Sequence, residues 1–171
     1  MKSTIQDKNK LVNSVFSQVY KKYDLMNDIM SLGVHRVWKE KFIDWMNPQP
    51  NTKLIDVASG TGDIANLFFT RSDGTGEVIC VEPNKEMLSR GKIKLKKYKS
   101  AKWINSSAES IPIEGNTFDY YSISYGIRNV SDINKVLKEA FRVLKPGGRF
   151  MCLEFSKIDN EILNLSLIHI S

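Results

Sequence analysis

A short glycine-containing turn within residues 56–65 has the residue types needed to hold a nucleotide. It follows an apolar run, and Gly60 and Gly62 let the backbone bend sharply and lie against a ligand without a Cβ in the way. Glu82 comes twenty residues after Gly62, at the end of the next apolar run, where a carboxylate can accept both hydroxyls of a ribose. The same spacing also fits a dinucleotide-binding pattern, so the glycines alone leave the ligand open.

Two further carboxylates, Asp56 and Asp63, flank this turn and bear on the choice of ligand. A pyrophosphate binds to bare backbone N–H groups at a helix N-terminus, with no anion beside it. Two carboxylates instead suit a ligand with an ammonium and a sulfonium, which S-adenosylmethionine carries. The alternative is structural, with Asp63 complementing a helix dipole and Asp56 capping a turn. We favour the cofactor interpretation because Glu82 accompanies both carboxylates.

The elements that position this turn follow from hydrophobic periodicity. Residues 11–46 show apolar spacings of three and four, which predict two amphipathic helices separated at Gly33, and two prolines follow in the connector 47–51. Beyond the connector, strand and helix patterns alternate. The strand candidates are residues 53–58, 77–82, 102–106, 118–124 and 149–155, and the helix candidates are residues 63–69, 85–97 and 132–144. The alternation predicts an α/β fold with a doubly wound, Rossmann-like parallel sheet.

We therefore predict three parts: an N-terminal helical cap over residues 1–50, a cofactor-binding α/β core over 51–157, and a tail over 158–171. A sheet of this type rarely stops at its fifth strand. The tail carries neither turn chemistry nor a helix stop. We expect a C-terminally truncated chain whose closing strands are missing and whose last residues are not native.

The composition is that of an ordinary globular chain, with 42% hydrophobic and 26% charged residues. No apolar run approaches the ~20 residues that cross a bilayer. Cys80 and Cys152 lie in apolar runs and are predicted to be buried thiols, and the helical spacing of Trp38, Phe42 and Trp45 predicts core positions. No residue cluster has metal-ligand spacing, so we expect no metal. The formal charge of +6 suits nucleic acid, an anionic membrane or an anionic small molecule and selects none of them.

Four longer stretches carry more specific patterns. Residues 23–38 and 142–156 match two long signatures, residues 58–63 match a cofactor loop, and residues 124–130 match a segment that follows a fourth strand. In these stretches the chain resembles the ubiquinone/menaquinone-biosynthesis C-methyltransferases. The resemblance implies the class I S-adenosylmethionine-dependent methyltransferase fold. It also implies methyl transfer to a ring carbon of a polyprenylated quinol precursor. Members of that family continue well past Ser156.

Carried over position by position, the resemblance also names cofactor contacts. They are Thr61 in the loop, Glu82 on the ribose, Ser107 and Ala108 beside the adenine, and Ser124 after the fourth strand. Asp56, Gly60 and Gly62 join this set through the charge and backbone arguments given above.

Catalysis requires a group that makes the substrate phenol more acidic, and Arg128 is our first candidate. It follows the fourth strand at the sheet edge where such folds bind ligands, and its guanidinium would favour a phenolate. Asn129 is the candidate hydrogen-bond partner, and His35 a candidate base near neutral pH. The alternatives are an ion-pair role for Arg128 and a packing role for His35. Tyr23 and Met26 either line a slot for the prenyl tail or pack between helices.

Residues 90–102 contain seven cations and no acid. The default interpretation is a solvated helix face, and the alternative is a peripheral contact with an anionic membrane. We expect a cytoplasmic protein, with attachment to the inner membrane face as the alternative. We expect no nucleic-acid partner, and the oligomeric state stays open. Rival functions are a nucleic-acid or other small-molecule methyltransferase, a nicotinamide-dependent oxidoreductase, and an inactive cofactor-binding fragment.

Overall fold

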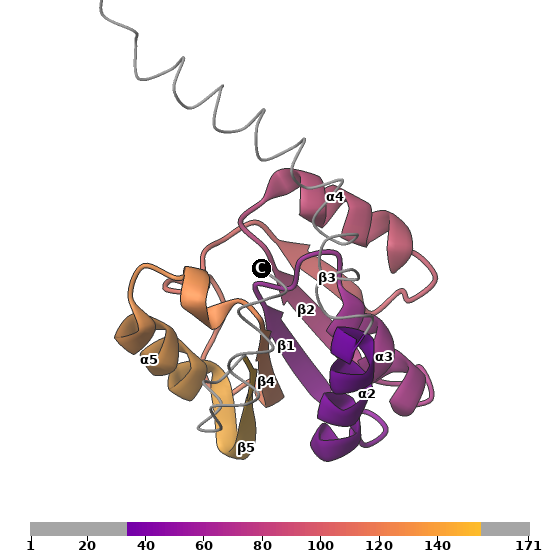
Figure 1. Cartoon of the computed structure of the whole chain (residues 1–171). Helices are drawn as coiled ribbons and strands as arrows, with labels where there is room; N and C mark the ends of the chain where they lie inside the picture. Colours follow the sequence, from indigo (N-terminus) through magenta and orange to yellow (C-terminus); the bar gives the residue numbers. More distant parts are fainter. Residues whose placement is uncertain (1–33, 155–171) are drawn as a thin grey trace, which may run out of the picture. The chain divides into compact units, whose positions relative to one another are not determined.

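The computed structural model describes residues 34–154 of the 171-residue chain (Figure 1). These residues divide between two compact units: the larger spans Lys39–Ser156 and holds the whole sheet, and the smaller includes residues 34–38. Several predictions lie outside the described residues. They concern the helix expected from residue 11, the slot at Tyr23 and Met26, the end of the second signature and the tail 158–171. The domain boundary expected near residue 50 also stays a prediction.

Helices and strands alternate along the described chain as the periodicity predicts. In chain order they are α2 (Val34–Met46), β1 (Lys53–Val57), α3 (Asp63–Arg71), β2 (Glu77–Val81), α4 (Lys85–Lys94), β3 (Ala101–Ile104), β4 (Phe118–Ser124), the 3₁₀ helix η1 (Ile127–Asn129), α5 (Ile133–Val143) and β5 (Leu144–Leu153).

The five strands form one parallel sheet in the order β3-β2-β1-β4-β5 (Figure 1). The chain moves outward from β1 through β2 to β3, and then crosses to the other side of β1 for β4 and β5. The strand order therefore reverses between β1 and β4. In open α/β sheets, ligands bind beyond the carboxyl ends of the strands at such a reversal. The predicted doubly wound α/β fold is confirmed. The reversal between β1 and β4 indicates where a ligand would bind.

Different helices cover the two faces of this sheet. Successive side chains of a strand point to opposite faces. In β1, Leu54 therefore packs with α2 and α3, whereas Ile55 packs with α5, and both side chains are fully buried. Because both faces are covered, the apolar residues of β1 do not alternate with exposed polar ones, and the strand also carries the buried Asp56.

Side-chain caps set where α4 and α5 begin. The Asn84 side chain accepts hydrogen bonds from the backbone N–H groups of Glu86 and Met87, and the Asp132 side chain accepts one from Lys135. Such caps satisfy amide groups that have no partner inside the helix. Helix α4 ends at Lys94, three residues before the predicted end.

Three local expectations from the sequence are wrong. The Trp45 side chain is 78% exposed, because Ile43 faces the core and a residue two positions along a helix points ~200° away from it. The Trp38 side chain is 41% exposed, so of the three predicted core residues only Phe42 is buried. Cys152 is exposed, because β5 is an edge strand of the described sheet. The fifth strand begins at Leu144, five residues before the predicted start, so that Pro146 and Gly147 lie within it, where the register with β4 shifts and the φ of Gly147 is 80°.

Candidate cofactor and active site

The carboxyl ends of β1 and β4 place several polar side chains together. Asp56 is in register with Ser122, whose hydroxyl donates to Asp56 Oδ1 over 2.7 Å, and both side chains are buried. Within the described residues, Asp56 Oδ2 has no hydrogen-bond partner, and neither has the buried Oγ of Ser124, two positions further on the same face of β4. Buried polar atoms without partners are costly, so this is a place where a polar ligand would be stabilised.

The charge state of Asp56 depends strongly on its burial. Burial raises its pKa from the ordinary 3.8 to about 7, although the Ser122 hydrogen bond and the charge of Lys39 lower it. A positively charged group beside Oδ2 would favour the ionised carboxylate. The site therefore favours a ligand that brings a cation to this position.

The turn after β1 requires left-handed backbone at three positions: Ala58, Gly60 and Gly62 have φ values of 51°, 58° and 78°. A Cβ at Gly62 would come within 2.9 Å of Leu95 Cδ1, so a side chain there is excluded by both conformation and space. Ala58 adopts this conformation at a cost of ~1 kcal/mol. Its methyl group lies only 2.6 Å from where a Cβ at Gly126 would be.

Glu82, the first residue after β2, is joined directly to this turn. Its Oε2 accepts a hydrogen bond from the Gly60 amide at 2.8 Å, and its Oε1 accepts one from the Asn84 amide at 2.9 Å. The residue is 5% exposed, and burial raises its pKa, with the two amides opposing that shift. Each carboxylate oxygen has two lone-pair directions, so one remains on each for ligand hydroxyls.

The first turn of α3 differs from the arrangement that the sequence suggested. Asp63 forms ion pairs with Lys39, at 2.6 Å, and with Lys94. Burial alone would raise the pKa of Asp63, but the two ammonium groups hold it well below its ordinary value. The negative charge of Asp63 is thus already compensated. The buried carboxyl groups that favour a cationic ligand are therefore those of Asp56 and Glu82.

Three other predicted cofactor residues lie in loops that follow β1 and β3. Thr61 is half-buried in the glycine turn. After β3, Ser107 is exposed and hydrogen-bonds to Glu109, whereas Ala108 is buried in the core on the α5 face. The adenine contacts assigned to Ser107 and Ala108 stay predictions.

Arg128 and Asn129 lie in η1, immediately beyond β4, and both are exposed. Arg128 Nη1 is 3.4 Å from Oε1 of Glu154, the residue that follows β5. Tyr125 belongs to the same cluster, because its pKa is raised to about 12 by burial and by the charge of Glu154, with Arg128 opposing both. The ion-pair alternative for Arg128 is therefore realised. Its guanidinium remains accessible to a ligand, since the side chain is 44% exposed.

His35 lies in the first turn of α2, within the smaller unit, and its role as a base stays a prediction. Sequence reasoning missed Ser122, Glu154 and the lysine partners of Asp63. Ser122 could have been found, because it lies two residues before Ser124 and must share its face of β4. The other contacts join residues far apart in the sequence and carry no local signal.

Within residues 34–154, no three His, Cys, Asp or Glu side chains are grouped so that they could hold a metal ion. In the same part of the chain, every helix is too short or too polar to cross a bilayer.

Comparisons of the sequence with known proteins identify the family to which the chain belongs. Residues 3–169 match the sequence model of the ubiE/COQ5 methyltransferase family. The chain belongs to this family. One relative is the "Ubiquinone/menaquinone biosynthesis C-methyltransferase UbiE" of Rickettsia bellii, 51% identical over 163 residues. Another is the "2-methoxy-6-polyprenyl-1,4-benzoquinol methylase, mitochondrial" of Dictyostelium discoideum, 41% identical over 192 residues.

These two alignments cover 92% and 94% of this ubiE/COQ5 family chain but 65% and 61% of the relatives. The chain thus spans slightly less than two thirds of their length. Among solved structures, the YcgJ protein from Bacillus subtilis has a TM-score of 0.65 and 25% identity, covering 77% of this chain and 56% of that one. A SAM-dependent methyltransferase from Aquifex aeolicus has a TM-score of 0.64 and 20% identity, covering 78% of each chain. The class I methyltransferase fold is confirmed.

Proposed function

We propose that this chain binds S-adenosylmethionine at the carboxyl ends of β1, β2 and β4 and transfers its methyl group to a ring carbon of a polyprenylated quinol. The observation that carries the proposal is the pair of buried atoms without partners, Asp56 Oδ2 and Ser124 Oγ, beside the glycine turn of a ubiE/COQ5 family chain. The names of the relatives, which refer to ubiquinone, menaquinone and polyprenyl-benzoquinol, support the substrate class.

The residues present fit this cofactor. Asp56 Oδ2 would accept from the ammonium, and Ser124 Oγ would supply a second polar contact beside it. The free lone pairs of Glu82 would accept from the ribose hydroxyls, and Gly60 and Gly62 would let the ligand approach the backbone. A pyrophosphate would instead face the two buried carboxylates, which argues against a nicotinamide dinucleotide.

When bound, S-adenosylmethionine supplies a methyl group on a sulfonium that is already a good leaving group. The chain therefore has mainly to align the reacting atoms and to make the phenol a better nucleophile. Arg128 would favour the phenolate by charge, and Asn129 would hydrogen-bond to the substrate. Glu154 would hold the Arg128 guanidinium in place through their 3.4 Å ion pair.

The test is incubation of the full chain with a demethylated prenyl-quinol and isotopically labelled cofactor, followed by mass spectrometry of the quinol. We expect the label on a ring carbon. Glu82→Ala should weaken cofactor binding by ~100-fold, since it removes a buried acceptor of several hydrogen bonds. Arg128→Ala should mainly slow turnover and leave the affinity nearly unchanged.

Equal losses of cofactor affinity in the two variants would contradict these roles. A rise in melting temperature with S-adenosylmethionine, without any methyl transfer, would identify a cofactor-binding fragment instead. Steeply salt-dependent binding and methylation of RNA would favour a nucleic-acid substrate.

A further inference from the structure

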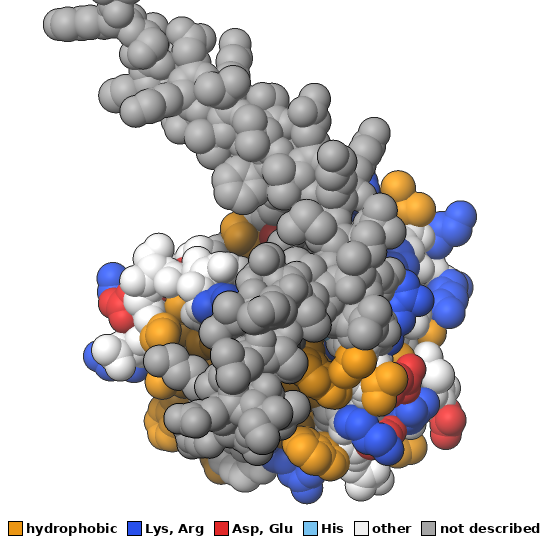
Figure 2. Space-filling view, viewed as in Figure 1, with side chains coloured by type: hydrophobic (Ala, Val, Ile, Leu, Met, Phe, Trp, Pro, Cys, Tyr) orange, Lys and Arg blue, Asp and Glu red, His pale blue; other side chains and the backbone are white. Residues whose placement is uncertain are grey.

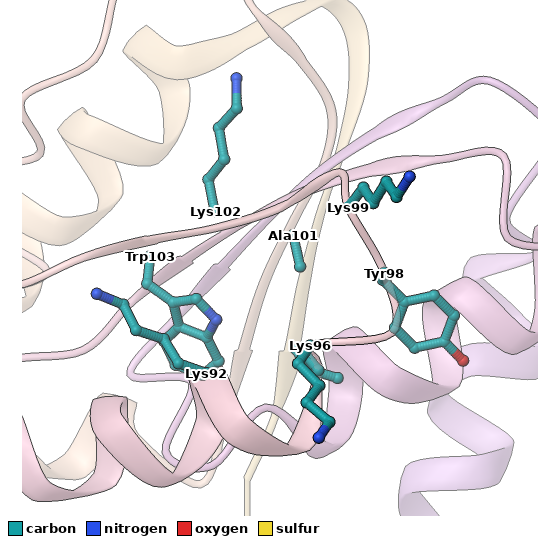
Figure 3. Close-up of a pocket in the computed structure, with 8 residues that line it drawn as sticks. Lys92, Lys96, Tyr98, Lys99, Ala101, Lys102 and Trp103 are labelled. Atoms are coloured by element: carbon teal, nitrogen blue, oxygen red, sulfur yellow. The ribbon is translucent and has the colours of Figure 1, made fainter.

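We propose that a lysine-rich surface at the end of α4 and the start of β3 docks this protein on an anionic lipid bilayer. The lysine surface consists of Lys92, Lys96, Lys99 and Lys102, which line an open hollow of about 510 Å³ together with Tyr98, Trp103 and two aliphatic residues (Figure 3). The inference rests on the proposed function, because a polyprenylated substrate resides in a membrane.

Within the described residues the four lysines form no ion pair with an acidic residue, and neither does Lys97 beside them, whose ammonium lies 4.7 Å from the centroid of the Tyr98 ring. On the same helix, Arg90 pairs with Glu86 and Lys94 pairs with Asp63. All four lysines of the surface are exposed, and within residues 34–154 none of them forms an ion pair. Figure 2 shows Lys and Arg side chains gathered on the right of the view, where Figure 1 places α3 and the end of α4.

Structural roles explain only part of this concentration of charge. Lys92, in the last turn of α4, complements the helix dipole. Lys102, on the edge strand β3, discourages pairing with another strand. Neither role applies to Lys96 and Lys99, which follow the helix in the turn before β3. Figure 3 shows Lys102 on the opposite side of β3 from Lys92 and Lys96, so the positive charge surrounds the start of this strand, and an anionic surface would offset it.

The aromatic residues of the hollow argue against nucleic acid as the partner. Single-stranded nucleic acid is bound on aromatic rings whose faces are free to stack with bases. Tyr98 is already stacked on Phe69, with ring centroids 4.1 Å apart. The Trp103 ring packs against Gly91 and Gly62, where it occupies the space that a Cβ would need.

The residues next to the lysine surface also fit docking on a bilayer. The side chain of Ile93 is 70% exposed beside Lys92, which puts an apolar group among cations as in proteins that lie on membrane interfaces. Trp103 contacts Gly62, and Lys94 pairs with Asp63, so the surface adjoins the glycine turn. Docking through the lysine surface would keep the protein at the membrane in which a polyprenylated quinol resides.

The experiment is co-sedimentation of the full chain with phosphatidylcholine vesicles with and without phosphatidylglycerol. We expect binding only to the anionic vesicles and release at high salt. The variant with all four lysines of the surface changed to Gln should bind at least ~100-fold more weakly, since each lysine contributes a several-fold factor. A matched control changes four exposed lysines elsewhere to Gln, and these are Lys41, Lys85, Lys135 and Lys138. The control should keep its affinity within ~5-fold.

Equal losses in the two quadruple variants would overturn the proposal, since net charge alone would then account for binding. Binding of a single-stranded RNA oligonucleotide that is tighter than vesicle binding and depends on the same four lysines would also overturn it. Methylation of a short-tailed quinol in solution separates the two proposals. A chain that methylates this quinol but never sediments with anionic vesicles lacks the docking surface. A chain that sediments through these lysines without methylating has the surface but not the proposed function.

Discussion

Asp56 and Asp63 lie at the two ends of one turn, yet their surroundings are opposite. Asp56 is buried with a single hydroxyl partner, and burial raises its pKa to about 7. Asp63 is partly exposed, and Lys39 and Lys94 hold its pKa well below the ordinary value. A carboxylate with an unpartnered oxygen can gain a stabilising interaction from a ligand. A carboxylate that already has two lysine partners gains little from one. The comparison therefore predicts that Asp56 serves binding and that Asp63 serves stability.

The strongest test of this division is cofactor affinity in two variants that remove the same charge. Asp56→Asn should weaken S-adenosylmethionine binding at pH 8 by ~100-fold, because the ammonium loses a buried ionic acceptor. Asp63→Asn should change the affinity by less than ~3-fold, because its carboxylate is already satisfied by lysines. Isothermal titration measures both. Similar losses in the two variants would mean that the turn acts as one undivided anionic site.

The pH dependence of binding sharpens the comparison further. Below about pH 7 the Asp56 carboxyl is protonated in the folded protein and presents no charge to a cation. Affinity for S-adenosylmethionine should therefore fall as the pH falls below about 7, by at most ~10-fold per pH unit, and stay level above it. Titrations at several pH values check this, with Asp56→Asn as the control that should show a flat profile. A wild-type profile that is equally flat would show that Asp56 does not contact the cation.

The stability role of Asp63 predicts a smaller effect. Asp63→Asn should lower the free energy of unfolding by about 1 kcal/mol, since it breaks two partly exposed ion pairs at a helix N-terminus. Because the folded-state pKa is lowered, this contribution is present above the ordinary pKa and disappears as the pH falls below it. Urea unfolding at low and high salt measures it, and the loss should shrink at high salt. A double-mutant cycle with Lys94→Gln should show coupling between the two residues.

The smallest expected effect concerns a buried polar atom on the other face of the sheet. The Tyr121 hydroxyl is buried and has no hydrogen-bond partner within the described residues, but it belongs to the core beside α5. Tyr121→Phe should leave cofactor affinity unchanged and alter the free energy of unfolding by less than about 1 kcal/mol, in the stabilising direction. Thermal unfolding and titration check both. Reduced cofactor binding would show that position on the sheet does not distinguish ligand-binding atoms from others.

The predictable parts of this molecule are those determined by neighbours in sequence. Alternating apolar runs and helical spacings identified the described strands and helices, because both patterns are local. The glycine turn and Glu82 could be paired since strand ends meet at one edge of a parallel sheet. The lysines that neutralise Asp63 could not be predicted, because Lys39 and Lys94 approach it only after three helices pack together. The exposure of Trp45 and Cys152 likewise depends on which face or edge the tertiary structure leaves uncovered.

The contact between Ala58 and Gly126 limits how this crevice can vary. The gap between the two strand ends has room for one methyl group, which Ala58 provides from a backbone conformation that alanine adopts reluctantly. Redesign of either position therefore has to treat the two as a single unit: glycine at 58 would vacate the volume that alanine at 126 requires. The distance between the crevice walls thus depends on the combined volume of the side chains at positions 58 and 126, not on either side chain alone.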